Sequence, residues 1–72
     1  MKVKEEEIAF LKSLRSVVDR LYKVVDFMYI ATACDECLRF LNCFLGEVME
    51  SLSYIIVEIS DRIDEMEERN KR

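Results

Sequence analysis

The chain has 72 residues, of which 51% are hydrophobic and 36% are charged, and its formal net charge is −4. It contains one glycine and no proline, so it lacks the turn residues that a sandwich or barrel of short strands requires. Its high apolar content excludes a disordered chain, and its acidic balance disfavours nucleic-acid binding, because phosphate contacts need a basic surface. We expect a single all-α domain over residues 1–72.

The first predicted helix covers residues 4–32. Glu5, Glu6 and Glu7 favour a helix N-terminus here, because the helix dipole attracts negative charge. Apolar residues at steps of three and four form its main row: Leu11, Leu14, Val18, Leu21, Val25 and Met28. A second row widens the apolar stripe to the width of a helix packed in a bundle. That row contains Phe10, Val17, Val24 and Ala31.

The predicted connection lies at residues 32–36. Extending the first helical repeat places Thr32, Asp35, Arg39 and Asn42 at core positions, so the apolar phase is lost there. Thr32 and Asp35 are also residue types that cap helix N-termini. Two alternatives to this turn are a break at Gly46 and a single long coiled-coil helix without any break.

The second predicted helix covers residues 36–69. Its main apolar row contains Leu38, Leu41, Leu45, Val48, Leu52, Ile55, Ile59 and Met66, widened by Met49, Ile56 and Ile63. Gly46 is expected on the outer side of this helix, and Arg62 is the one charge at a core position. An antiparallel hairpin with this turn would place Lys12 level with Ile56 and Glu58.

One hairpin is expected to leave much of this apolar surface in water. Side chains such as Tyr22, Phe40 and Tyr54 lie off the main rows, and large exposed apolar patches usually mark an interface. We therefore expect the hairpin to dimerise into a four-helix bundle, with a docking site for another protein as the alternative use of its aromatic surface. The predicted core and oligomer interface comprises Leu11, Leu14, Val18, Leu21, Val25, Phe27, Met28, Leu38, Leu41, Phe44, Leu45, Val48, Leu52, Ile55 and Ile59.

Three cysteines lie around the predicted turn, at Cys34, Cys37 and Cys43. The chain has no histidine and no second C-x2-C motif, so the pattern is a weak match to a zinc site. We expect buried thiols that fill a helix-packing surface, with a disulfide and a metal site as alternatives. An odd number of cysteines fits a reducing compartment, and we expect the protein in the cytoplasm.

A candidate basic patch lies on the first helix. It consists of Lys12, Arg15, Arg20 and Lys23. Asp19 and Asp26 interrupt it, so we expect no nucleic-acid partner. A nucleic-acid-associated regulator that uses these four residues is nevertheless the alternative function.

No catalytic set is predicted. The serines have no histidine to activate them, and the acidic residues of the second helix fall outside its core row. The longest uncharged runs are much shorter than the roughly 20 apolar residues of a membrane-spanning helix, and the N-terminus does not resemble a signal peptide. We expect no enzyme, no cofactor and no membrane partner. The predicted function is a non-enzymatic protein–protein interaction module, an adaptor or small regulatory scaffold, that acts as a homo-oligomer.

Overall fold

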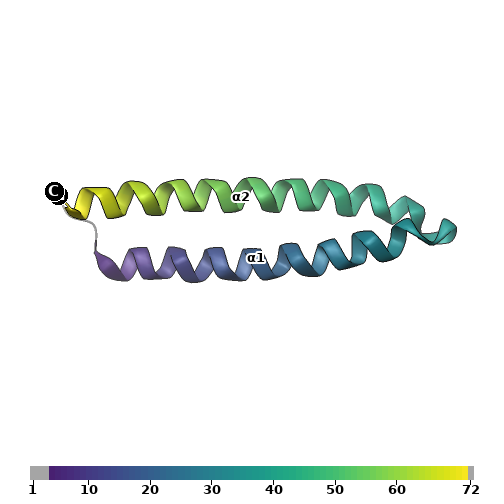
Figure 1. The fold of residues 1–72 in the computed structure, drawn as a ribbon, viewed down its shortest axis with the longest axis horizontal. Helices are drawn as coiled ribbons and strands as arrows, with labels where there is room; N and C mark the ends of the chain where they lie inside the picture. Colours follow the sequence, from purple (N-terminus) through teal and green to yellow (C-terminus); the bar gives the residue numbers. More distant parts are fainter. Residues whose placement is uncertain (1–3, 72) are drawn as a thin grey trace.

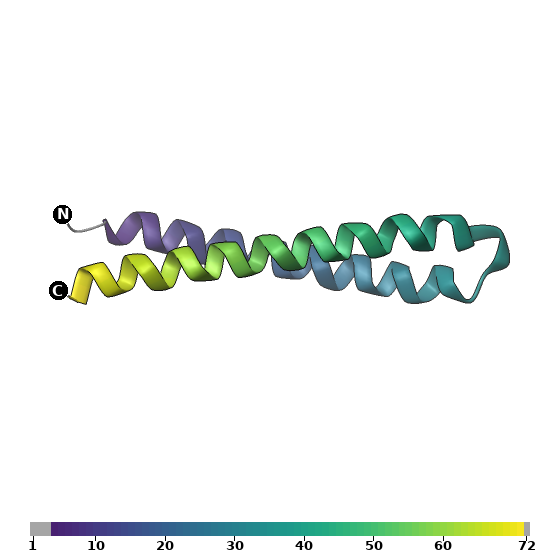
Figure 2. The same ribbon diagram turned by 90° about the horizontal axis from the view of Figure 1, so that it is seen from above.

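The computed structural model describes residues 4–71 as two long helices that run antiparallel, side by side (Figure 1). Helix α1 spans Glu5–Ala33 and helix α2 spans Arg39–Lys71, with a short 3-10 helix η1 at Glu36–Leu38 between them. The hairpin measures 55 × 14 × 11 Å. Figure 2 shows the start of α1 and the end of α2 at one end of the hairpin and the connection at the other. The predicted all-helical hairpin is confirmed. The two alternatives are wrong, because Gly46 lies inside α2 and because the chain reverses between Ala33 and Arg39.

The connection begins slightly later than predicted. Asp35 has an extended backbone, and its Oδ1 accepts a hydrogen bond from the Cys37 backbone N–H at 2.9 Å, which caps η1. Thr32 is not a cap. It stays inside α1, where its hydroxyl donates to the Met28 carbonyl oxygen at 2.9 Å. Of the two predicted capping residues, only Asp35 therefore acts as one.

The core of the molecule is a narrow seam, which we define as the buried and half-buried side chains between the two helices. The α1 side of the seam contains Ile8, Leu11, Arg15, Val18, Tyr22, Val25 and Thr32. The α2 side contains Asn42, Leu45, Met49, Leu52, Ile56, Ile59, Ile63 and Met66. Among the described residues, the only buried hydrophobic side chains are Ile8, Val18 and Ile63.

The residues of the predicted core and oligomer interface divide between the seam and the exposed surface of the hairpin. Leu11, Val18, Val25, Leu45, Leu52 and Ile59 lie in the seam. The remaining predicted residues are exposed in the hairpin; they are Leu14, Leu21, Phe27, Met28, Leu38, Leu41, Phe44, Val48 and Ile55. Two packed helices bury only a narrow arc of each helix, so a wide apolar stripe cannot be covered by one neighbour.

The predicted register of the hairpin is wrong. Lys12 pairs with Glu67, whereas the sequence reasoning placed it level with Ile56 and Glu58. The reason is η1, which lengthens the connection and moves the midpoint of the hairpin past Glu36.

The expectation for Gly46 is also wrong. This residue is half-buried beside Tyr29, and a Cβ atom added to it would lie 3.3 Å from Cε2 of that ring. Gly46 thus faces α1 and is not on the outer side of α2.

Candidate interaction surface

An uncovered apolar row runs along α1 beside the seam. We call it the α1 stripe, and it consists of Phe10, Leu14, Val17, Leu21, Val24, Met28 and Ala31. These positions repeat at steps of three and four, and all seven are exposed. Phe10 is 66% exposed and Val24 is 57% exposed. The α1 stripe contains no polar residue over its whole length, so it is a continuous apolar surface facing water.

A second exposed row runs along α2. We call it the α2 stripe, and it consists of Leu41, Phe44, Val48, Ser51, Ile55, Glu58 and Arg62. Its half near the connection is apolar, whereas its half near the C-terminus carries Glu58 and Arg62. The two exposed rows therefore differ in chemistry.

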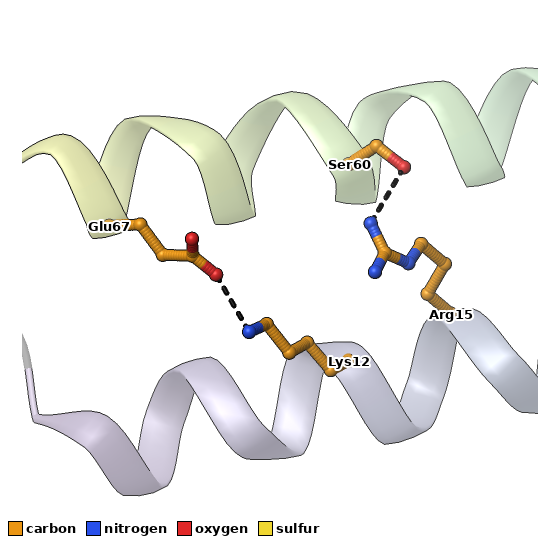
Figure 3. Close-up of polar contacts among 4 residues, drawn as sticks. All are labelled: Lys12, Arg15, Ser60 and Glu67. Carbon is orange, nitrogen blue, oxygen red and sulfur yellow. Dashed lines mark hydrogen bonds and ion pairs between the residues drawn. The ribbon is translucent and has the colours of Figure 1, made fainter.

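Polar contacts between the helices mark the opposite side of the seam (Figure 3). Lys12 Nζ lies 2.8 Å from Glu67 Oε1, and Arg15 Nη1 donates to Ser60 Oγ at 3.3 Å. Successive helical residues are rotated by about 100°, so Lys12 and Leu14 lie on opposite sides of the seam.

The same rotation places the α2 stripe on the side of the seam away from Ser60 and Glu67. On that side, Phe10, Leu11 and Met66 line one shallow groove between the helices. The two stripes therefore form one surface of the hairpin, which we call the apolar face.

The total surface of the chain is large for its size. It exposes 5874 Å², whereas a compact folded monomer of 8.6 kDa exposes about 4,700 Å². The excess, about 1,200 Å² by the same scaling, is larger than the roughly 800 Å² that each partner buries in a standard protein–protein interface. The hairpin therefore has the spare surface that a stable dimer needs.

The predicted basic residues do not form a free patch. Lys12 is paired with Glu67, Lys23 Nζ lies 3.3 Å from Asp19 Oδ2, and Arg15 points across the seam to Ser60. The hydrogen bond and the positive charge from Lys12 lower the pKa of Glu67. Of the four basic residues, two are neutralised by neighbouring carboxylates.

The cysteines are exposed, and the expectation of buried thiols is wrong for the hairpin. Cys34, Cys37 and Cys43 are all free and exposed. Cys34 and Cys37 lie at the connection, which no other part of the described chain covers. Within residues 4–71, no group of three or more histidine, cysteine or acidic side chains is arranged to hold a metal ion.

Three aromatic residues lie outside the apolar face. Phe27, Phe40 and Tyr54 are exposed. Helical positions place Phe27 and Phe40 on the outer sides of α1 and α2, and Tyr54 lines a shallow groove together with Tyr22 of α1. Phe27 was predicted in the interface, and the structure does not bring it together with the α1 stripe.

By length and composition alone, the helical segment Glu36–Lys71 could cross a membrane, since an 18-residue window in it has a mean hydropathy of 1.4. None of that window is buried in the hairpin, and its seam residues Leu45, Leu52 and Ile56 are only half-buried against α1.

No protein-family model, curated protein or solved structure matches the chain.

Proposed function

We propose that the chain is a non-enzymatic protein–protein interaction module, an adaptor or small regulatory scaffold, that acts as a dimer of hairpins joined into a four-helix bundle. The observation that carries this proposal is the apolar face, whose α1 stripe offers seven exposed apolar positions in succession. Contiguous apolar surface of this extent is rare on monomeric soluble proteins.

The small core of the hairpin supports the same proposal. Only three hydrophobic side chains are buried among the described residues, and a chain of fewer than about 70–80 residues gains little stability from a single core. A second copy on the apolar face would cover the exposed rows and make the wide stripe the core of a bundle.

Sedimentation equilibrium of the full chain tests the proposal. We expect a species of twice the chain mass of 8.6 kDa at micromolar concentration. Val24→Glu should convert it to a monomer, because it places a charge in the α1 stripe. Val57→Glu is the matched control, since Val57 is 54% exposed against 57% for Val24 but lies outside the apolar face. A wild-type chain that stays monomeric at micromolar concentration would overturn the proposed dimer.

The alternative function, a nucleic-acid-associated regulator, gains no support from the arrangement of the basic residues. Lys12 and Lys23 are engaged by carboxylates, which leaves little free positive charge for phosphate binding. An electrophoretic shift with RNA or duplex DNA at low salt that is lost in Arg20→Ala would replace the proposal with this alternative.

The proposal places the module in the cytoplasm, with α2 packed against α1 and the second copy instead of lipid. Cell fractionation tests this placement. We expect the protein in the soluble fraction. Recovery of the protein in the membrane fraction, with an attachment that an alkaline wash does not release, would show that α2 spans a bilayer.

A further inference from the structure

We propose that the two hairpins join antiparallel along α1, with Leu21 of each chain at the two-fold axis. This inference rests on the proposed function, because it specifies how a second copy covers the apolar face. It places the connections of the two hairpins at opposite ends of the bundle.

The α1 stripe is complementary to itself when one copy is reversed. A two-fold interface uses the same patch on both subunits, and the stripe repeats symmetrically about Leu21. The facing pairs are Phe10 with the partner's Ala31, Leu14 with the partner's Met28, Val17 with the partner's Val24, and Leu21 with the partner's Leu21. Each pair is apolar, and the largest residue of the stripe, Phe10, meets the smallest.

The same two-fold axis organises α2. Arg15 contacts Ser60 and Tyr29 contacts Gly46, so Leu21, midway between, lies level with Tyr54 and Ile55. The axis therefore brings Ile55 against the partner's Ile55.

The polar members of the α2 stripe meet one polar and one apolar position. Ser51 lies opposite the partner's Glu58, whereas Arg62 lies opposite the partner's Val48 and beside the partner's Glu47, so its long stem can cover Val48 of the partner subunit while its guanidinium reaches solvent. Nearer the ends, Leu41 and Phe44 lie beside the partner's Arg69 and the partner's Glu65, whose charged groups reach solvent at the rim of the bundle.

The competing arrangement puts both connections at the same end and packs α1 against the partner's α2. It would place Val17 on the partner's Glu58, Leu14 on the partner's Arg62 and Phe10 on the partner's Glu65. Charged groups would then interrupt the α1 stripe, and burying a charge without a partner is costly.

The opposite charges of the two helices favour that competing arrangement at long range. Residues 8–34 carry four basic and two acidic side chains, whereas α2 is acidic. Exposed charges are screened over about 8 Å at physiological salt, so the direct contacts of the α1 stripe decide the geometry.

Disulfide cross-linking tests the arrangement in a full-length chain whose three native cysteines are replaced by serine. Leu21→Cys alone should cross-link to its own copy, at least about tenfold faster than Met28→Cys alone, because the effective concentration of facing thiols is far above that of free chains. Met28→Cys is the matched control from the same stripe, since its partner in the dimer is Leu14. The double variant Leu14→Cys with Met28→Cys should cross-link as Leu21→Cys does, which keeps the test valid if a cysteine at Leu21 weakens the dimer.

Sedimentation of the same variants separates the two ways of failing. One outcome is a dimer that cross-links in a mixture of Leu21→Cys and Ile55→Cys chains, but not in Leu21→Cys alone or in the double variant Leu14→Cys with Met28→Cys. That outcome would overturn the antiparallel α1 pairing and leave the proposed function standing. If the wild-type chain and the chain with its three cysteines replaced by serine both sediment as monomers, the antiparallel pairing and the proposed function are both overturned.

Discussion

At the scale of single residues, Gly46 is the position where helix propensity and packing oppose each other. Glycine costs about 1 kcal/mol relative to alanine inside a helix, but a Cβ here would lie 3.3 Å from Cε2 of Tyr29. Because Tyr29 is 36% exposed, its ring can move outward by the small distance required. We expect Gly46→Ala to raise the free energy of unfolding by about 0.5 kcal/mol, measured by urea denaturation. Gly46→Leu should lower it, and a loss in the alanine variant would show that the ring is held in place.

The ion pair of Lys12 and Glu67 gives a prediction for pH. Hydrogen bonding from Lys12 and its positive charge lower the pKa of Glu67 in the folded chain. The folded pKa is below the unfolded one, so the pair's contribution is complete above the unfolded value and is lost as the pH falls through the folded value. Both side chains are largely exposed, and the effect on stability is therefore small.

The measurement is a carboxyl NMR titration of Glu67. Its midpoint should move upward in Lys12→Met, because the variant removes both the hydrogen bond and the charge. Lys23→Met is the control, since that lysine pairs with Asp19 on the same helix. An unchanged midpoint in Lys12→Met would contradict the pairing across the hairpin.

Asn42 shows what residue-level sequence reasoning missed at the connection. Extending the first repeat through Asn42 gave a polar residue at a core position, which indicated only that the apolar phase had ended. In the structure this residue is half-buried, and its Nδ2 donates to the Tyr29 carbonyl oxygen at 2.7 Å and to Thr32 Oγ1 at 3.3 Å. A side-chain bond to a backbone carbonyl on another helix has no signature in helical periodicity, so the sequence could not identify it.

At the scale of elements, Asn42 ties the start of α2 to the end of α1. We expect Asn42→Ala to lower the free energy of unfolding by about 1–2 kcal/mol, because it leaves the Tyr29 carbonyl without this donor. Urea denaturation measures the loss. An Asn42→Ala chain as stable as wild type would show that water replaces the bond without cost.

The helices and the connection were predictable, whereas the seam was not. Steps of three and four define a helix regardless of which neighbour it meets, and the loss of phase near Asp35 marks the turn. The α1 helix, however, has more apolar rows than one neighbour can cover. The seam takes the row of Leu11 and Val18 together with the row of Arg15 and Tyr22, neither of which belongs to the predicted core row.

Arg15 can occupy the seam because its aliphatic stem packs there while its guanidinium donates to Ser60 Oγ. This leaves the second apolar row, with Phe10, Val17 and Val24, outside the hairpin. The charged residue in the seam and the apolar row outside it therefore have the same cause, which is the face of α1 that packs against α2. The most continuous apolar surface of α1 is therefore the one that α2 leaves exposed.

At the scale of the whole molecule, the hairpin is long and thin. Its radius of gyration is 16.4 Å, against about 11 Å for a compact domain of this length. A second hairpin would add thickness without adding length. The resulting bundle would bury the α1 stripe and the apolar half of the α2 stripe, so folding and association should be coupled.

Coupled folding and association predict a melting temperature that depends on chain concentration. Because two unfolded chains form one folded dimer, mass action stabilises the folded state as concentration rises. A tenfold increase should raise the Tm by about 3–6 °C, measured by circular dichroism at 222 nm. Val24→Glu should lower the Tm and abolish its concentration dependence, because its charge would face the apolar α1 stripe of a second copy. Val57→Glu should keep the wild-type dependence. If the wild-type Tm is the same at every concentration, the hairpin folds alone and its apolar face has another use.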